Sequence, residues 1–466
     1  MPSPTRTGSS DGAPSDADER RLAERRELRA KILHLALPLI GANFAQTALS
    51  VTDTAMVGRL GAKQLAAMGP PNVFFLVLFL TTSATFMGVQ ALTARRFGED
   101  RPQECGKILD NGLVLAFAIG IGAGLLGLFL APPLCSLLVR DPEVARLSSE
   151  YLIVRWGGVV TLTTLWVLKG YYFGLGITRI DLWISLGMNL VNIFLNWVLL
   201  FGNLGSPAFG LAGAAWASVA STGMAAIIYL WHASGAARRE RFGHLRLAGI
   251  ETERMMAIVR LSAPRAMAGL AFGGSILFFK LIADHASEAG LAASTAIWRF
   301  TGVAVLASIA IGSAAASLVG HELGAGRPER AEVVAREATR IGMMISAAIG
   351  LVVVAMPDLV MRIFSEDPAV ISAGAPGLRL IAVFLFVDAG GIILARVLSS
   401  AGCVLYVMTM EFLVSLVLML GAAFYLVRHH PDNLAAVWLS WAVYMVGWYL
   451  AMALKFGAGG WKRVRI

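Results

Sequence analysis

Long apolar segments recur along almost the whole chain and are separated by short polar segments. Most are about 18 residues or longer, long enough for a helix to cross a hydrocarbon core of about 30 Å. They lack the roughly ten-residue alternation of apolar and polar positions that is typical of transmembrane β-strands. The pattern therefore predicts an all-α integral membrane protein of about twelve spans, near residues 33–57, 72–93, 110–134, 150–174, 181–202, 208–232, 256–283, 291–318, 338–357, 377–399, 403–428 and 434–456.

Composition supports lipid as the solvent of this chain and excludes several functions. Hydrophobic residues make up 57% of the 466 positions and charged residues only 15%, which is outside the range of soluble domains. The three cysteines are far apart and show no ligand spacing, so no disulfide or metal framework is indicated. The seven histidines lie at or beyond span ends, and no nucleophile–base pair or phosphate-binding glycine loop is visible. We therefore expect neither an enzyme nor an organic cofactor.

The distribution of lysine and arginine predicts the orientation. Alternate loops are rich in cations, and the loops between them are poorer in cations and carry acids, which places both termini in the cytoplasm by the positive-inside rule. This bias explains the net charge of +9 without nucleic-acid binding. We expect a monomer in the plasma (inner) membrane, in contact with lipids. Residues 1–31 lack the apolar core of a signal peptide and are predicted to be a disordered cytoplasmic tail with a helical collar.

An internal repeat indicates two homologous halves, because several landmarks recur at a constant spacing of 226 residues. Each half holds six spans, so the repeats are parallel and related by an axis along the membrane normal. The predicted domains are an N-lobe at 32–235, a basic linker at 236–255 and a C-lobe at 256–466, with a central cavity between the lobes. The recurring pairs are Pro38 and Pro264, Leu65 and Leu291, Gly98 and Gly324, Arg101 and Arg327, Pro102 and Pro328, Asp141 and Asp367, and Gly176 and Gly402.

Asp53 and three asparagines are the main candidates for a functional site inside the membrane. A buried charge costs about 2.5–3.5 kcal/mol on insertion scales, so Asp53 in the first span needs a partner or a purpose. Asn189, Asn192 and Asn196 in the fifth span are three and four residues apart, which places their amides on one helical face. A carboxylate beside such amides can hold a proton or ligate a dehydrated cation such as Na⁺. The alternative is that these groups only join helices through hydrogen bonds.

Asp388 lies in the middle of the tenth span and is the candidate of the second half. It either lines the C-lobe or pairs with a cation, for which Lys280 and Arg299 are candidates. We expect Lys280 to extend toward the outer interface instead. Glu411 and Arg396 lie near the inner ends of their spans, where an interfacial position is expected.

Several segments resemble the multidrug and toxic compound extrusion (MATE) family over residues 32–455. The resemblance rests on four segments, namely the first span from Leu37-Pro38-Leu39 to Gly61, Val191–Asn196 with Phe201-Gly202, Gly213–Ser218, and Val319–Pro328. It implies a V-shaped pair of six-helix lobes that exports cationic, amphipathic compounds against a proton or sodium gradient. Many relatives have an acid where this chain has Asn196, and some have a glutamate in the seventh span where this chain has Phe272-Gly273-Gly274.

By position, the resemblance makes Asp53 the coupling carboxylate, with Asn192, Asn196 and Ser218 as its partners. It also matches Asp388 to an acidic position that some branches of the family use, and Pro38 is a candidate hinge because proline kinks helices. A role in the substrate cavity is weighed for a further set of residues, against the alternative of packing, namely Gln46, Trp166, Tyr172 and Asn189.

Two other functions remain open at this point. A flippase for a lipid-linked precursor would share the two-lobed architecture, but anionic headgroups favour a cavity rich in Arg and Lys, and cations inside the spans are few, namely Arg155, Arg265, Lys280 and Arg299. A non-transporting receptor or scaffold would have no need of Asp53 beside the asparagines.

Overall fold

The computed structural model describes residues 16–245, 249–271, 278, 287–429 and 434–466, and all regular structure in these residues is helical. The helices of the first half are α1 (Asp16–Gly58), α2 (Ala62–Gly98), α3 (Pro102–Leu138), α4 (Pro142–Gly157), α5 (Val159–Gly174), α6 (Arg179–Phe201), α7 (Leu211–Ser234) and the short α8 (Ala236–Phe242). Those of the second half are α9 (Thr252–Ala271), α11 (Glu288–Ala304), α12 (Leu306–Gly324), α13 (Pro328–Ala355), α14 (Pro357–Arg362), α15 (Pro368–Ser400), α16 (Val404–Val414), a π-helical segment (Ser415–Gly421), α17 (Ala422–His429) and α18 (Leu434–Gly457).

The described residues form a multi-pass membrane protein. Ten helical segments are long and apolar enough to cross a membrane, and the pair α4 and α5, bent by 42° at its break, is an eleventh. The predicted seventh span, 256–283, begins as α9 and continues beyond the described residues. The expectation of an all-α membrane protein with two repeated lobes is therefore confirmed.

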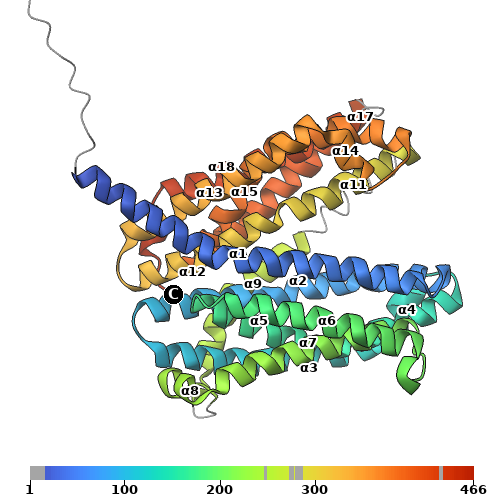
Figure 1. Ribbon diagram of the computed structural model, residues 1–466, viewed down its shortest axis with the longest axis horizontal. Coiled ribbons are helices and arrows are strands. Elements are labelled where there is room, and N and C mark those ends of the chain that lie inside the picture. Colours follow the sequence, from blue (N-terminus) through green and yellow to red (C-terminus); the bar gives the residue numbers. More distant parts are fainter. Residues whose placement is uncertain (1–15, 246–248, 272–277, 279–286, 430–433) are drawn as a thin grey trace, which may run out of the picture.

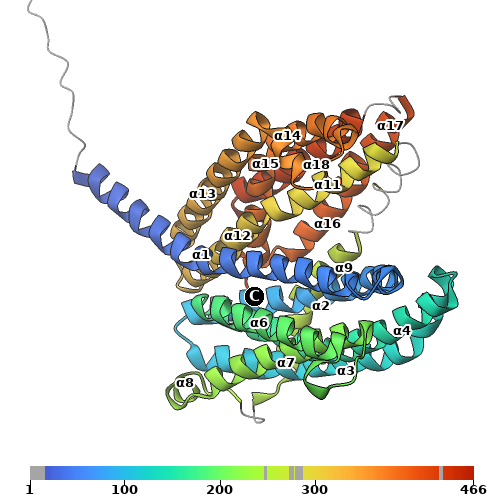
Figure 2. The ribbon, with the colours of Figure 1, turned by 45° about the vertical axis from the view of Figure 1, so that its right-hand side comes forward.

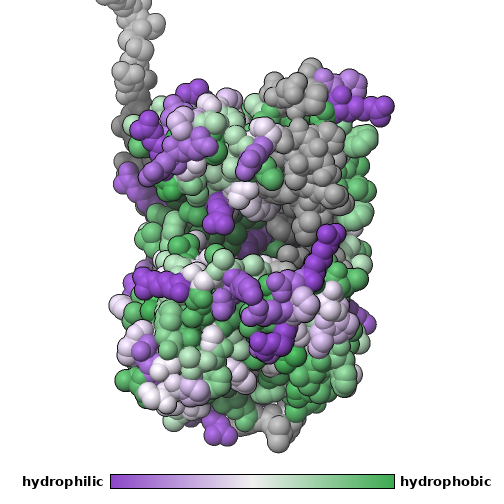
Figure 3. Space-filling model, turned by 90° about the vertical axis from the view of Figure 1, so that its right-hand side faces the viewer, coloured by the Kyte–Doolittle hydropathy of each residue, from purple (hydrophilic) through white to green (hydrophobic). Residues whose placement is uncertain are grey.

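The helices form two lobes that join at one end and diverge at the other (Figures 1 and 2). The N-lobe contains α2 to α8 and the C-lobe contains α11 to α18, while α1 and α9 run along the boundary. The C-terminus lies at the joined end (Figure 1). Seen from the opposite end, the surface is hollowed between the lobes (Figure 3).

The first helix of each half also packs against the other half. Ile32 and Ala36 of α1 are buried in the C-lobe core, and the Arg29 side chain pairs with Glu337 of α13 at 2.7 Å. In the same way Ile258 of α9, which is 226 residues after Ile32, is buried in the N-lobe core. The proposed boundary at residue 32 is thus not a packing boundary, because the first part of α1 lies on the C-lobe and its second part lies beside α6 of the N-lobe.

The joined end depends on backbone contact between α2 and α12. A Cβ atom on Gly98 would lie 2.1 Å from the carbonyl oxygen of His321, and a Cβ on Gly324 would lie 2.2 Å from that of Arg95. These four residues are two pairs related by the 226-residue repeat, so the contact is symmetric about the axis between the lobes. Only glycine allows so close an approach. Nearby, the Gln90 amide donates to the Ser313 carbonyl at 2.9 Å.

The last residues of the chain connect the two lobes at this end. Trp461 is fully buried in the C-lobe core, and Lys462 pairs with Glu332 of α13. The following residues reach α2 of the N-lobe, where Arg95 donates to the Val464 carbonyl at 2.7 Å and Arg96 to the Ile466 carbonyl at 3.3 Å. The chain end therefore adds to the contacts that hold the lobes together.

Other repeat landmarks have matching structural roles. Asp141 and Asp367 each cap the N-terminus of the helix that follows, with side-chain oxygens that accept from backbone N–H groups. Gly176 and Gly402 have φ angles of +74° and +96°, a backbone conformation that favours glycine. The linker packs on the N-lobe at α3, where Asn111 donates to the Gly249 carbonyl at 2.8 Å. Residues 1–15 of the predicted tail lie outside the described residues, and from residue 16 the chain is helical.

The glycine contact gives a direct test of this packing. Gly98→Ala should lower the thermal unfolding midpoint of the purified protein, because overpacking of this kind typically costs about 1–3 kcal/mol. Gly122→Ala is the matched control, since a Cβ at that position on α3 would meet nothing within 4 Å. In the control, the better helix propensity of alanine should leave the midpoint equal or higher. Equal midpoints for the two variants would contradict the close α2–α12 contact.

Candidate functional site

A chain of hydrogen bonds links Asp53 of α1 to the asparagines of α6 and the serines of α7. The Asn196 amide nitrogen donates to Asp53 Oδ1 at 2.6 Å and to Asn192 Oδ1 at 2.8 Å. The Asn192 amide nitrogen in turn lies 3.3 Å from Ser221 Oγ and 3.5 Å from Ser218 Oγ. The structure therefore brings together all four residues proposed as a coupling site, and adds Ser221.

Local sequence explains how the three helices meet. The four-residue spacing of Asn192 and Asn196 stacks their amides along one face of α6, and both side chains are almost fully buried. Gly213 at the start of α7 lets that helix approach α6 closely, because a Cβ there would lie 2.5 Å from the Leu199 carbonyl. This approach brings the serines of α7 within reach of the Asn192 amide.

The site offers acceptor oxygens as well as donors. The side-chain oxygens of Asn196 and Asn189 are buried and have no hydrogen-bond partner among the described residues. With the Asp53 carboxylate they supply only oxygen, the donor type that hard cations prefer. The described part of the chain has no group of three or more His, Cys, Asp or Glu side chains that could hold a metal ion. Any cation bound here would therefore depend on one carboxylate and neutral oxygens.

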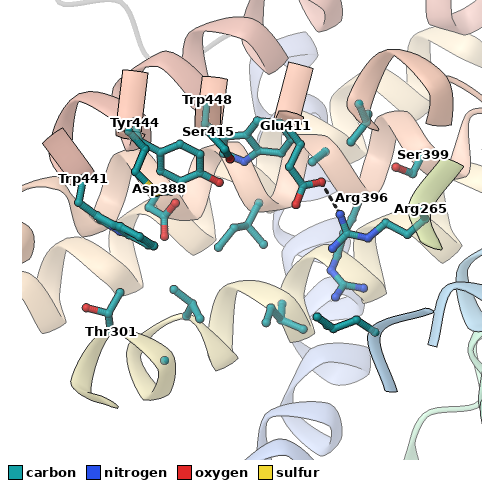
Figure 4. A pocket seen from close by; sticks show the side chains of 18 of the residues that line it. Arg265, Thr301, Asp388, Arg396, Ser399, Glu411, Ser415, Trp441, Tyr444 and Trp448 are labelled. Carbon is teal, nitrogen blue, oxygen red and sulfur yellow. Dashed lines mark hydrogen bonds and ion pairs between the residues drawn. The ribbon is translucent and has the colours of Figure 1, made fainter. Parts of the chain in front are cut away.

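Asp388 lies in a separate cavity of about 440 Å³ within the C-lobe (Figure 4). We call it the C-lobe cavity; it is lined mainly by residues of α9, α11, α12, α15, α16, the π-helical segment and α18. Leu80 and Met87 of α2 line it from the other lobe. Asp388 is only 8% exposed and points into this space beside Trp441 and Tyr444 (Figure 4).

The charged residues around this cavity differ from two expectations. Arg299 is exposed and forms no ion pair with Asp388, and Lys280 lies outside the described residues. Arg396 and Glu411, expected at the interface, instead line the cavity. Glu411 pairs with Arg265 of α9, because two opposite charges in apolar spans are less costly together than apart.

The four residues considered for the substrate cavity lie in different surroundings, and none lines the C-lobe cavity. Gln46 is exposed on α1, and Trp166 packs edge-on against Phe79 and Phe86. Asn189 is buried on the asparagine face of α6. Tyr172 packs in the N-lobe core, which is the alternative weighed for it, because its side chain is 1% exposed and its hydroxyl lies 2.7 Å from His232 Nδ1.

Sequence reasoning overlooked the basic side of the C-lobe cavity. Arg265, Arg396 and Glu411 are charged residues within apolar segments, and such residues are rare enough to mark a site. The sequence does not show that they lie close together, because they belong to three different spans and it does not indicate which spans pack against each other. The aromatic wall of Trp441, Tyr444 and Trp448 was hidden among many other aromatic positions.

Asn192 joins α6 to α7, because its side chain accepts from Asn196 and donates to the serines of α7. Asn192→Ala removes a buried acceptor and a buried donor at once, so we expect a loss of about 1–3 kcal/mol and a lower thermal unfolding midpoint. Asn203→Ala is the control, because the exposed Asn203 amide, which donates to the Trp197 carbonyl, can bind water instead. A variant at Asn192 as stable as this control would show that the network carries little of the packing.

Comparisons with known proteins agree with this architecture. The MatE family model matches residues 38–198 and 264–424, two ranges offset by the same 226 residues as the internal repeat. Relatives include the probable multidrug resistance protein NorM of Thermotoga maritima, 25% identical over 94% of both chains, and NorM of Burkholderia vietnamiensis, 30% identical over 76% of this chain and 77% of that protein. PmpM of Pseudomonas aeruginosa is 28% identical over 79% of this chain and 78% of its own.

Solved structures show the same fold. An outward-facing multidrug resistance MATE family transporter superposes with a TM-score of 0.84 at 21% identity, covering 93% of this chain and 95% of its own. A MATE protein in a bent conformation gives a TM-score of 0.83 at 22% identity, over 93% and 96% of the two chains. With family matches in both halves, an internal repeat and two joined lobes, the chain belongs to the multidrug and toxic compound extrusion family of transporters.

Proposed function

We propose that this protein is a secondary active antiporter that exports cationic, amphipathic organic compounds in exchange for a proton or a sodium ion. The observation that carries the proposal is the bonded chain from Asp53 through Asn196 and Asn192 to the serines of α7. It is a carboxylate that accepts a hydrogen bond from one neutral amide, Asn196, which in turn is bonded to a second amide, Asn192. Relatives named multidrug resistance proteins support efflux of small molecules.

Coupling requires that the ion and the substrate compete. A proton or Na⁺ at Asp53 removes the negative charge that attracts a cationic substrate, so ion binding favours substrate release. Either ion finds a suitable partner, since the proton binds a carboxylate oxygen and Na⁺ binds that oxygen together with the free side-chain oxygen of Asn196. The ion and the substrate therefore compete for the negative charge of Asp53, and each lowers the affinity of the protein for the other by the same factor.

Alternating access would follow from rocking of the lobes about their joined end. The hollow between the lobes opens at the end opposite the C-terminus (Figure 3). The positive-inside rule puts the basic loops and both termini in the cytoplasm, so the joined end faces the cytoplasm. The open end then faces the outside of the plasma (inner) membrane. Pro38 is the only proline inside α1, and α1 changes direction along its length (Figure 1). A bend there would move the Asp53 half of the helix relative to the half that packs on the C-lobe.

The test is gradient-driven transport of ethidium in vesicles that contain the purified protein, with proton and sodium gradients imposed separately. We expect one gradient to drive wild-type transport and Asp53→Asn to reduce this rate at least tenfold, because the amide cannot release a proton or attract a cation.

Asp141→Asn is the matched control, since it makes the same chemical change at an exposed helix cap where asparagine is an equally good residue. Gradient-driven transport by Asp53→Asn at the wild-type rate would contradict the coupling role. Transport of ethidium under neither gradient by the wild type would instead favour a flippase for a lipid-linked precursor.

A further inference from the structure

The C-lobe cavity has two ends of opposite charge. Figure 4 shows Asp388 at one end, beside Trp441 and Tyr444, and the guanidinium groups of Arg265 and Arg396 at the other. Two carboxylates and two guanidiniums line it, so the formal charges balance while remaining spatially separated. A volume of about 440 Å³ is within the range of sites for drug-sized molecules.

The acidic end is an unpaired buried carboxylate. Asp388 is 8% exposed and makes no hydrogen bond or ion pair with the residues that the structure describes. Its neighbours Trp441 and Tyr444 present aromatic rings to the same space (Figure 4). A carboxylate flanked by aromatic rings suits an organic ammonium group, which gains from both the charge and the ring faces.

The basic end has more positive than negative charge. Glu411 pairs with Arg265, and the Arg396 guanidinium lies next to that of Arg265 (Figure 4). Within the described chain, the hydrogen-bond partner of the Arg396 guanidinium is a neutral hydroxyl, Ser313 Oγ, at 3.1 Å. Two guanidiniums thus share one carboxylate. Arginine in such a setting binds a further carboxylate well, because its planar donors match the two oxygens.

The wall between the two ends is apolar and aromatic. Trp448 of α18 and Met419 of the π-helical segment line it, together with Leu80 and Met87 of α2 from the N-lobe. The π-helical turn also contributes Ser415, and such turns are frequent at functional sites. Since α2 closes one side, movement of the lobes would change this wall. The affinity for a bound molecule therefore depends on the relative position of the two lobes.

We propose that the C-lobe cavity binds zwitterionic aromatic amphiphiles, with the ammonium group at Asp388 and the carboxylate group at Arg396. This narrows the substrate class of the proposed exporter and rests on that proposed function. A plain cation satisfies Asp388 but leaves the excess guanidinium charge facing an apolar molecule, which is costly in a buried site. A zwitterion of suitable length neutralises both ends, so Arg396 acts as the residue that selects for an acid group.

The test is equilibrium binding to the purified full-length protein with two dyes that differ at one group. Rhodamine B is a zwitterion, and its ethyl ester is a cation with the same aromatic core. We expect the wild type to bind rhodamine B about tenfold more tightly than the ester, measured by fluorescence anisotropy. Equal affinities, or tighter binding of the ester, would overturn the proposal.

Two variants are expected to change the preference for rhodamine B in opposite directions. The test therefore does not depend on whether one particular variant folds. Arg396→Gln should abolish the preference by weakening rhodamine B binding while leaving that of the ester unchanged or stronger. Glu411→Gln should increase the preference, because it frees Arg265 for the dye carboxylate. Arg299→Gln, at an exposed arginine of α11 outside the cavity, is the matched control and should leave the preference unchanged. A lower preference in Glu411→Gln would also overturn the assignment.

Binding distinguishes this proposal from the exporter proposal. If rhodamine B is preferred and the variants behave as described, the cavity assignment holds even where ethidium transport fails in vesicles. If transport is coupled through Asp53 but the two dyes bind equally, the exporter proposal stands and the zwitterion site is wrong.

Discussion

The contact between the α2 and α12 backbones at the joined end is the constraint on which the rest of the structure depends. Gly98 and Gly324 bring the helices close enough for a carbonyl of each to occupy the space of a side chain on the other. Because the residues are equivalent in the two halves, the contact defines the axis between the lobes. The two boundary helices pack across it, since α1 contacts α12 of the C-lobe and α9 contacts α2 of the N-lobe.

The second constraint is the cost of placing charge in lipid, and the two lobes meet it differently. In the N-lobe, the Asp53 carboxylate accepts a hydrogen bond from the neutral amide of Asn196. In the C-lobe, Arg265 and Glu411 neutralise each other, while Asp388 and Arg396 face the cavity from separate positions. The N-lobe thus holds one carboxylate beside neutral amides, and the C-lobe holds separated charges of both signs around one cavity. The two lobes thus share one fold but carry different polar residues.

Much of the fold could be predicted from the sequence because the membrane imposes length and hydrophobicity on each span. The repeat went further, since matching glycines and prolines at a constant spacing indicated which positions are equivalent. The asparagine spacing on α6 likewise placed Asn192 and Asn196 on one face, and the structure joins them to Asp53. Side-chain partners between distant spans could not be predicted in this way. The bond of Tyr172 to His232 depends on how α5 and α7 pack, and Arg396 was expected at the interface because the packing of its span was unknown.

The central claim is that two rigid lobes rock about their joined end, and electron–electron distance measurements between spin labels test it most directly. Arg140 and Glu366 are exposed, equivalent positions at the open end, and Arg101 and Arg327 are exposed, equivalent positions at the joined end. The three native cysteines would be replaced, and a cysteine would be introduced at both positions of one pair for spin labelling. The distance between the two labels would then be measured first with ethidium and then with acid or Na⁺. The account predicts that the open-end distance shortens as the joined-end distance lengthens. Distances that stay constant, or that change in the same direction at both ends, would contradict it.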